Sequence, residues 1–242
     1  MHKPLESAVH LPRRASLEEK IAASEAFLCD LAEKFDPGRV YVAWTGGKDS
    51  TTALWLWRRV LERFGCKESR AISIDTGLKF PEVMAFRERM TRQWGVDVHV
   101  ARPDVNLDTY PVAKDKVSCC ADLKIAPLKR ALRELDVAVM LTGVRADEHL
   151  SRSSRKPLEP RTDPDVLEAN PILHWTEMDV WAHITQAGLP YCGLYDLGYR
   201  SLGCRPCTAP SPGGGHGDGA ERAGRHRDKD GRLEALRDLG YF

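Results

Sequence analysis

A short β-rich run that leads directly into a glycine loop and a helical pattern constrains the fold of this chain most strongly. Residues 39–44 read Arg-Val-Tyr-Val-Ala-Trp, residues 45–50 read Thr-Gly-Gly-Lys-Asp-Ser, and the helical pattern continues to about Phe64. The glycines let the backbone turn and expose N–H groups, while the positive end of the following helix suits a phosphate or pyrophosphate. Because the lysine follows the glycines directly, this is not the Walker pattern. An ordinary strand–helix turn is the alternative interpretation.

Strands continue to alternate with helices beyond this unit. Further β-rich runs lie at 71–74, 96–100 and 137–141, and helical patterns lie at 81–94 and 122–135. This alternation predicts an α/β fold, with a parallel sheet and helices on both faces, of the Rossmann-like type. Beyond Gly143 the alternation stops, and the charged, proline-rich residues 145–170 predict a long active-site loop. A helix is then expected at 176–187, with Thr176 as its N-cap.

We expect three parts along the chain. Residues 1–37 form an N-terminal arm and a helix that starts at the capping box Ser16–Glu19, and residues 38–210 form the nucleotide-binding domain. Residues 211–242 form a glycine-rich hinge and a C-terminal tail helix. The fold is also expected to carry a C-terminal cluster-binding extension. The formal net charge of +1 gives no global attraction to nucleic acid or membrane. No apolar run approaches a membrane span and no secretory signal is visible, so a cytoplasmic location with reduced cysteines is expected.

Two cysteine pairs, Cys119-Cys120 and Cys204-x-x-Cys207, predict a metal centre. Four thiols in two tight pairs can close around one centre, and ligation by thiolates alone favours an iron–sulfur cluster or zinc over harder metals. Adjacent cysteines chelate awkwardly, which suits a large cluster better than a tetrahedral zinc ion. Structural zinc, a disulfide and free thiols remain the alternatives.

Several further motifs accompany the loop and the cysteines: Asp75-Thr-Gly77, Cys119-Cys-x-x-x-Lys124, Thr142-Gly-Val-Arg145-x-Asp147 and Asn170-Pro-Ile-x-x-Trp175. Together, over roughly residues 38–210, they resemble the phosphoadenylyl-sulfate reductase-like family of PP-loop (N-type) ATP pyrophosphatases, with Thr45 in place of the usual serine. The cysteine quartet resembles that of the [4Fe–4S] adenylyl-sulfate reductases. The resemblance implies an adenine nucleotide alpha hydrolase-like fold that binds an adenine nucleotide at the carboxyl edge of the sheet.

The resemblance and the residue types together give a set of expected site residues. We expect catalytic roles for Lys48, Lys124 and Arg145. Nucleotide contacts are expected from Thr45, Gly46, Gly47, Lys48, Asp49, Ser50, Asp75, Gly143 and Arg152, and [4Fe–4S] ligation from Cys119, Cys120, Cys204 and Cys207. Asp49 could also help to hold Mg²⁺ with ATP. The alternatives are that Asp75 only caps a loop, and that Arg145, Asp147 and Arg152 form a solvated charge cluster.

Two departures from the family pattern shape the functional hypothesis. Reductases of the family use a catalytic cysteine on a C-terminal segment, but no cysteine follows Cys207 in this sequence. An intact Gly-Gly-Lys-Asp-Ser loop matches members that split ATP between its α and β phosphates. The first hypothesis is therefore an adenylating enzyme of sulfur metabolism that uses ATP with Mg²⁺ and a [4Fe–4S] cluster to transfer sulfur from a donor such as a cysteine desulfurase.

Two alternatives stay open. One is an adenylyl-sulfate or phosphoadenylyl-sulfate reductase, with Cys192 or a thiol-bearing partner as the nucleophile and thioredoxin as the reductant. The other is a non-catalytic subunit that binds a nucleotide and a cluster. The near-neutral charge gives no support for a nucleic-acid acceptor. No membrane partner is expected, and a homo-oligomer is compatible with the sequence.

Overall fold

A mixed six-stranded sheet forms the centre of the computed structural model, which describes residues 15–211, 221–225 and 236. The strand order is β3-β2-β1-β4-β6-β5, and all neighbours are parallel except β5 and β6. The strands are β1 (Val40–Ala43), β2 (Ser69–Ile74), β3 (Val96–Ala101), β4 (Val139–Leu141), β5 (Leu158–Thr162) and β6 (Asp165–Ala169). The expected α/β fold is confirmed, and β5 adds one antiparallel strand at the edge of the otherwise parallel sheet.

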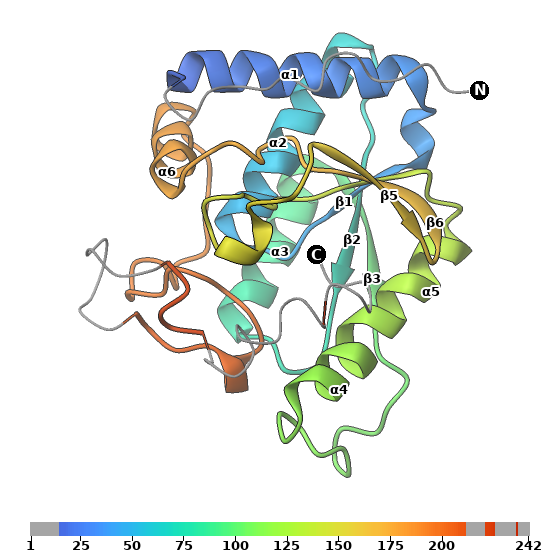
Figure 1. Ribbon diagram of the computed structural model, residues 1–242, viewed down its shortest axis with the longest axis vertical. Helices are drawn as coiled ribbons and strands as arrows, with labels where there is room; N and C mark the ends of the chain where they lie inside the picture. The colour runs from blue at the N-terminus through green and yellow to red at the C-terminus, as the bar shows by residue number, and fades with distance from the viewer. Residues whose placement is uncertain (1–14, 212–220, 226–235, 237–242) are drawn as a thin grey trace.

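Helices cover both faces of the sheet (Figure 1). They are α1 (Leu17–Lys34), α2 (Lys48–Arg63), α3 (Pro81–Trp94), α4 (Lys116–Cys120), α5 (Ala126–Glu134) and α6 (Glu177–Gln186). Successive side chains of a strand point to opposite faces. Val40 and Val42 accordingly pack in the core with α1, α2, α3 and α6, while Tyr41 and Ala43 pack in a second core against α5.

Local capping signals are reproduced at two helix starts. Ser16 and Glu19 form a reciprocal capping box at α1, and Thr176 and Asp179 form another at α6. Asp179 also accepts a hydrogen bond from the buried Lys20 at 2.6 Å, which ties α6 to α1. None of the helices in the described part of the chain is both long and apolar enough to cross a bilayer.

Two predicted segments differ in the structure. The helix expected from 122 to 135 begins earlier, at Lys116, and runs through α4, a π-helical turn (Ala121–Ile125) and α5, so the first cysteine pair lies on a helix. The expected loop 145–170 contains the β5–β6 hairpin. The arm 1–14 and the glycine-rich hinge 212–219 lie outside the described residues. Of the expected tail helix only Leu236 is described; it is helical and packs near Cys120 and Ile125.

The sheet has a topological switch point between β1 and β4. The chain runs outward from β1 through β2 to β3, and β4 then joins the opposite side of β1. In open α/β sheets, ligands bind outside the carboxyl ends of the strands at such a point. The loop after β1 (residues 44–47) and the loop after β4 (residues 142–145) therefore meet where a ligand site is expected.

Candidate functional site

The loop between β1 and α2 has a compact internal hydrogen-bond pattern. Gly46 lies at φ 80°, in the left-handed region that favours glycine. The Thr45 N–H donates to Ser50 Oγ at 3.2 Å, and the Ser50 hydroxyl donates to the Gly47 carbonyl at 3.1 Å. These bonds fold the loop over the N-terminus of α2, where an anion is favoured by the helix dipole.

The loop after β4 packs directly on this phosphate loop. A Cβ placed on Gly143 would lie 2.5 Å from the Ser50 nitrogen and 2.7 Å from the Asp49 carbonyl carbon. Only glycine permits so close an approach of two backbones. Gly143 thus fits the two loops together rather than contributing a functional group.

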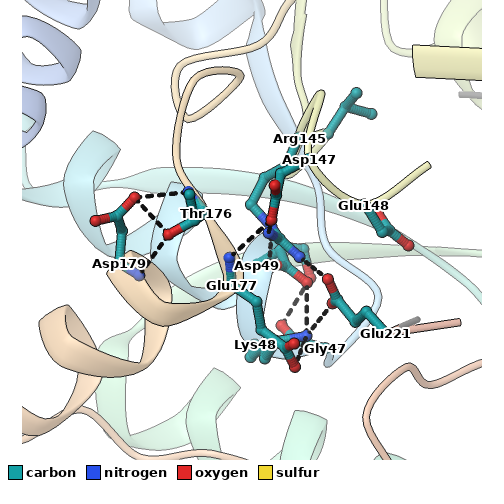
Figure 2. Close-up of polar contacts among 12 residues, drawn as sticks. Gly47, Lys48, Asp49, Arg145, Asp147, Glu148, Thr176, Glu177, Asp179 and Glu221 are labelled. Atoms are coloured by element: carbon teal, nitrogen blue, oxygen red, sulfur yellow. Dashed lines mark hydrogen bonds and ion pairs between the residues drawn. The ribbon is translucent and has the colours of Figure 1, made fainter. Parts of the chain in front are cut away.

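Four charged side chains meet behind the loop, as Figure 2 shows. Lys48 Nζ donates to Glu221 Oε1 at 2.5 Å, Arg145 Nη2 donates to Glu221 Oε2, and Arg145 Nε donates to Asp49 Oδ1 at 2.7 Å. The side chains of Lys48 and Arg145 are fully buried, and that of Glu221 is 7% exposed. The alternative of a solvated charge cluster is thus wrong for Arg145, whose guanidinium is inaccessible to water.

Burial and close charges act against each other in this group. Burial alone would lower the pKa of Lys48, but Asp49, Tyr195 and Glu221 outweigh it and hold that pKa above its usual range. The pKa of Arg145 is raised in the same way, because Asp49 and Glu221 oppose the effect of burial. Both cations therefore stay charged at any physiological pH. Burial raises the pKa of Glu221, with Lys48 and Arg145 opposing the rise.

A cavity of about 110 Å³ lies beside this group, at the mouth of the phosphate loop. Its lining includes Thr45, Gly47, Asp49, Ser50, Gly143, Arg152, Tyr195, Arg222 and Arg225. Arg152 and Arg222 both bind Glu148, and these two arginines hold the pKa of Glu148 far below its usual range against the opposing effect of burial. Arg225 is 5% exposed, and its Nε is buried with no hydrogen-bond partner among the described residues. Arg225 is thus a cavity-lining arginine with one buried N–H that no described residue accepts.

One member of the cysteine quartet, Cys204, lies close to this cavity, because its neighbour Gly203 packs against Arg225. Thr76 Oγ1 lies 3.3 Å from Cys204 Sγ at the carboxyl end of β2, and a Cβ on Gly203 would collide with the Arg225 guanidinium. The pKa of Cys119 is raised by burial, and Cys120, Cys204 and Cys207 add to the rise. All seven cysteines are free of disulfides. Across 15–211, 221–225 and 236, no group of three or more His, Cys, Asp or Glu has a geometry that could hold a metal ion.

The cavity lining lacks five of the expected nucleotide-binding or catalytic residues: Gly46, Lys48, Asp75, Lys124 and Arg145. Lys48 and Arg145 belong to the buried charged group beside the cavity. Asp75 accepts the Gly77 N–H at 3.1 Å and lies 3.6 Å from Arg102, so it caps the loop after β2 in the manner of the simpler alternative. Lys124 is 8% exposed and lies in the π-helical turn that follows Cys120. Cys192 is 1% exposed within the main core, and burial raises its pKa, so it serves as a packing residue.

Four residues of the site lacked a recognised sequence signal: Tyr195, Glu221, Arg222 and Arg225. Tyr195 accepts the Lys48 backbone N–H through its hydroxyl at 2.8 Å, from a segment 147 residues further on. Glu221 and the two arginines follow the glycine-rich segment. The clustering of Glu-Arg-x-x-Arg just beyond the second cysteine pair was the one available hint.

Comparisons with known proteins agree with the family that the motifs resemble. The sequence profile described as the phosphoadenosine phosphosulfate reductase domain matches residues 39–210. Adenosine 5'-phosphosulfate reductase 1 of Bacillus subtilis (strain 168) is 31% identical over 153 residues, which are 60% of this chain. The match spans 65% of the length of that relative, so the activity of the whole relative does not transfer to this chain by similarity alone.

Solved structures support the same fold. The phosphoadenylyl-sulfate reductase of Candida auris, in a phosphate complex, superposes with a TM-score of 0.65 at 20% identity, covering 83% of this chain and 99% of that chain. A U34-tRNA thiolase of Methanococcus maripaludis with its [4Fe–4S] cluster superposes with a TM-score of 0.53 at 16% identity, covering 72% and 65%. At these identities the likeness concerns the fold of the chain.

Proposed function

The chain belongs to the phosphoadenosine phosphosulfate reductase domain family, and from this premise we propose that it reduces a sulfonucleotide, adenylyl sulfate or phosphoadenylyl sulfate, to sulfite. One observation carries the proposal: Arg225 lines the anion cavity and also lies against Gly203, next to Cys204. A sulfuryl group in this cavity would lie between a cationic wall and the thiol-rich turn. The fold, the family and the named relatives support the same substrate class.

The proposed reaction uses a thiolate from a dithiol partner such as thioredoxin. The thiolate attacks the sulfuryl sulfur, the bond from sulfur to the bridging oxygen breaks, and its electron pair leaves on the nucleotide phosphate. The product is an S-sulfo group on the first thiol of the partner. The second partner thiol then attacks the sulfur of that first thiol, which forms a disulfide and releases sulfite, so the dithiol supplies both electrons. Arg222 and Arg225 would stabilise the charge that develops on the leaving phosphate. An external thiol is favoured because Cys192 is buried in the core.

The quartet Cys119, Cys120, Cys204 and Cys207 has the donor chemistry of an iron–sulfur site, because it offers four cysteine thiols that form no disulfide. A bound [4Fe–4S] cluster would supply a polarising neighbour to a sulfuryl group in the cavity. Lys124 and Arg205 would add positive charge beside these ligands. The protein would act as a cytoplasmic enzyme, where thiols stay reduced.

A second candidate function is the adenylation of an acceptor by ATP with Mg²⁺, followed by sulfur transfer. The intact Gly-Gly-Lys-Asp-Ser loop favours it, since Lys48 lies at the N-terminus of α2 where a leaving pyrophosphate would be stabilised. A cysteine desulfurase would then be the sulfur donor. This candidate keeps the same nucleotide site but replaces sulfite with pyrophosphate as the diagnostic product.

One paired assay separates the candidates. The protein is reconstituted with iron and sulfide without oxygen, then incubated with adenylyl sulfate or phosphoadenylyl sulfate plus reduced thioredoxin, and separately with ATP and Mg²⁺. We expect sulfite with a sulfonucleotide, and a large loss of rate in Arg225→Ala but not in the exposed control Arg92→Ala. Pyrophosphate without sulfite would favour the second candidate. Nucleotide binding without either product would contradict both and favour a non-catalytic subunit.

A further inference from the structure

Glu221 occupies the innermost anion position of the site. Its two carboxylate oxygens accept hydrogen bonds from Lys48 and Arg145, which come from α2 and from the loop after β4 (Figure 2). A position with two buried cations at a helix N-terminus is where an anionic group of a ligand would bind. Here the chain provides the anion itself.

Two further donors around this position are also engaged within the chain, whereas Arg145 Nη1 is buried without a hydrogen-bond partner among the described residues and lies 3.5 Å from Asp147. The Lys48 backbone N–H donates to the Tyr195 hydroxyl at 2.8 Å, and Lys48 Nζ donates to the Arg200 carbonyl at 2.9 Å. The side chains around this position already include more carboxylates than cations. Three cations face four carboxylates there: Lys48, Arg145 and Arg200 against Asp49, Asp147, Glu177 and Glu221. Further phosphate groups would therefore be repelled unless Glu221 moved away.

The adjacent cavity has more arginines than carboxylates in its lining. It measures about 110 Å³, and its charged lining residues are Arg152, Arg222 and Arg225 with Asp49 and Glu148. Arg225 Nε has no partner among the described residues. The same short segment therefore fills the inner position through Glu221 and lines the outer cavity through its two arginines. Its backbone is attached to the second cysteine turn, since the Ala209 N–H donates to the Gly224 carbonyl at 2.9 Å.

We propose that Glu221 is a specificity-determining residue whose carboxylate takes the position that the terminal phosphates of ATP would need, so that the site prefers adenosine nucleotides with a single phosphate or phosphosulfate group. This inference deepens the proposed function and rests on it for the assignment of the nucleotide site. ATP can bind only by displacing a buried carboxylate from two cations, whereas a nucleotide with one phosphate uses the outer cavity and leaves Glu221 in place.

The test compares the dissociation constants of AMP and ATP, each with Mg²⁺, by titration calorimetry on the full-length chain. We expect wild type to bind ATP at least about tenfold more weakly than AMP, and Glu221→Gln to reduce that ratio by about tenfold, as expected for one charge-assisted contact. Glu168→Gln is the matched control, because Glu168 is likewise a buried carboxylate bound by two arginines, Arg155 and Arg161, but lies on β6 and not in the cavity lining.

The outcomes separate this proposal from the proposed function. If the wild-type protein binds ATP as tightly as AMP, the proposed role of Glu221 is wrong. The role is also wrong if folded Glu221→Gln has the same ratio of ATP to AMP dissociation constants as wild type. If that variant fails to fold, Glu221→Asp keeps the charge but shortens its reach, and an ATP-to-AMP ratio equal to that of wild type would count against the proposal. Sulfite production by the same wild-type sample tests the reaction alone, so the binding ratio and the reaction can fail independently.

Discussion

At the scale of single residues, Gly143 controls how closely the two loops of the nucleotide site can approach. A methyl group there would lie 2.5 Å from the Ser50 nitrogen, so Gly143→Ala must push the loop after β4 away from the phosphate loop. We expect a loss of roughly 1–3 kcal/mol in the free energy of unfolding, by analogy with overpacked cores. Nucleotide affinity should fall as well. Urea denaturation and AMP titration measure the two effects.

The control for this substitution is Gly193→Ala. A Cβ on Gly193 would meet no heavy atom within 4 Å, and its φ is not positive. We expect its free energy of unfolding to stay within about 0.5 kcal/mol of wild type. If Gly143→Ala were equally harmless, the two loops would have room to separate and the tight packing of the site would not matter for binding.

Tyr195 provides a second test at this scale. Its hydroxyl accepts the Lys48 N–H in a partly buried setting, and burial raises the pKa of the phenol, so the group stays neutral. Tyr195→Phe leaves that N–H without an acceptor, at an expected cost of about 1–3 kcal/mol in unfolding free energy. The control is Tyr191→Phe, since Tyr191 is 36% exposed and its partner Asp196 is reached by water. If both variants lose the same unfolding free energy, the hydrogen bond to Lys48 contributes no more to stability than an exposed one.

At the scale of elements, the start of α6 depends on one threonine. The Thr176 hydroxyl accepts the Asp179 N–H at 3.1 Å, and the Asp179 carboxylate accepts the Thr176 N–H at 2.6 Å. Thr176→Ala removes the first bond and should cost about 0.5–2 kcal/mol in unfolding free energy, measured with urea. Thr185→Ala, on the exposed side of the same helix, should cost less. The reverse order would show that α6 is stabilised by packing and not by its cap.

Asp179, the acidic member of this capping box, predicts that the stability of the fold depends on pH. Partial burial alone would raise the pKa of Asp179, but hydrogen bonds from Lys20 and Thr176 outweigh it and hold the pKa below its ordinary value. A carboxyl group with a lowered folded-state pKa stabilises the fold above its unfolded pKa and loses that contribution as pH falls through the folded value. The stability gap between wild type and Asp179→Asn should thus be constant near neutrality and shrink below about pH 4. A gap that is the same at pH 3 and pH 7 would contradict this.

The elements that the sequence predicts well are those with local signals. The helix at 81–94 matches α3 residue for residue, and both expected helix caps are present. The β5–β6 hairpin was missed because its charges suggest a loop, whereas they pair with one another across the strands. Glu168 lies between Arg155 and Arg161, and such pairing becomes visible only once the strands are aligned. The π-helical turn after Cys120 likewise leaves no pattern in the sequence.

At the scale of the whole molecule, the site is assembled from segments far apart in the chain. The phosphate loop and Gly143 could be predicted because the motifs fix the carboxyl ends of β1 and β4. Glu221 could not, since it lies beyond the family match at 39–210 and reaches Lys48 across 173 residues. Its contacts follow from tertiary folding and from the need of buried cations for a partner, and neither leaves a local signal. A carboxylate that closes a phosphate site must therefore be found in the structure.

The cysteine quartet spans the same long distances and gives the last prediction. Cys119 and Cys120 lie on α4, whereas Cys204 and Cys207 flank a turn at the carboxyl end of β2, so a shared cluster would join two parts of the fold. After anaerobic reconstitution, Cys204→Ser should lose the iron–sulfur absorption at roughly 400 nm. Cys192→Ser is the control, because that thiol is buried in the main core. If the absorption survives in Cys204→Ser but disappears in Cys192→Ser, the metal centre lies elsewhere. The contact between Arg225 and the turn at Cys204 would then no longer support a reaction beside a cluster.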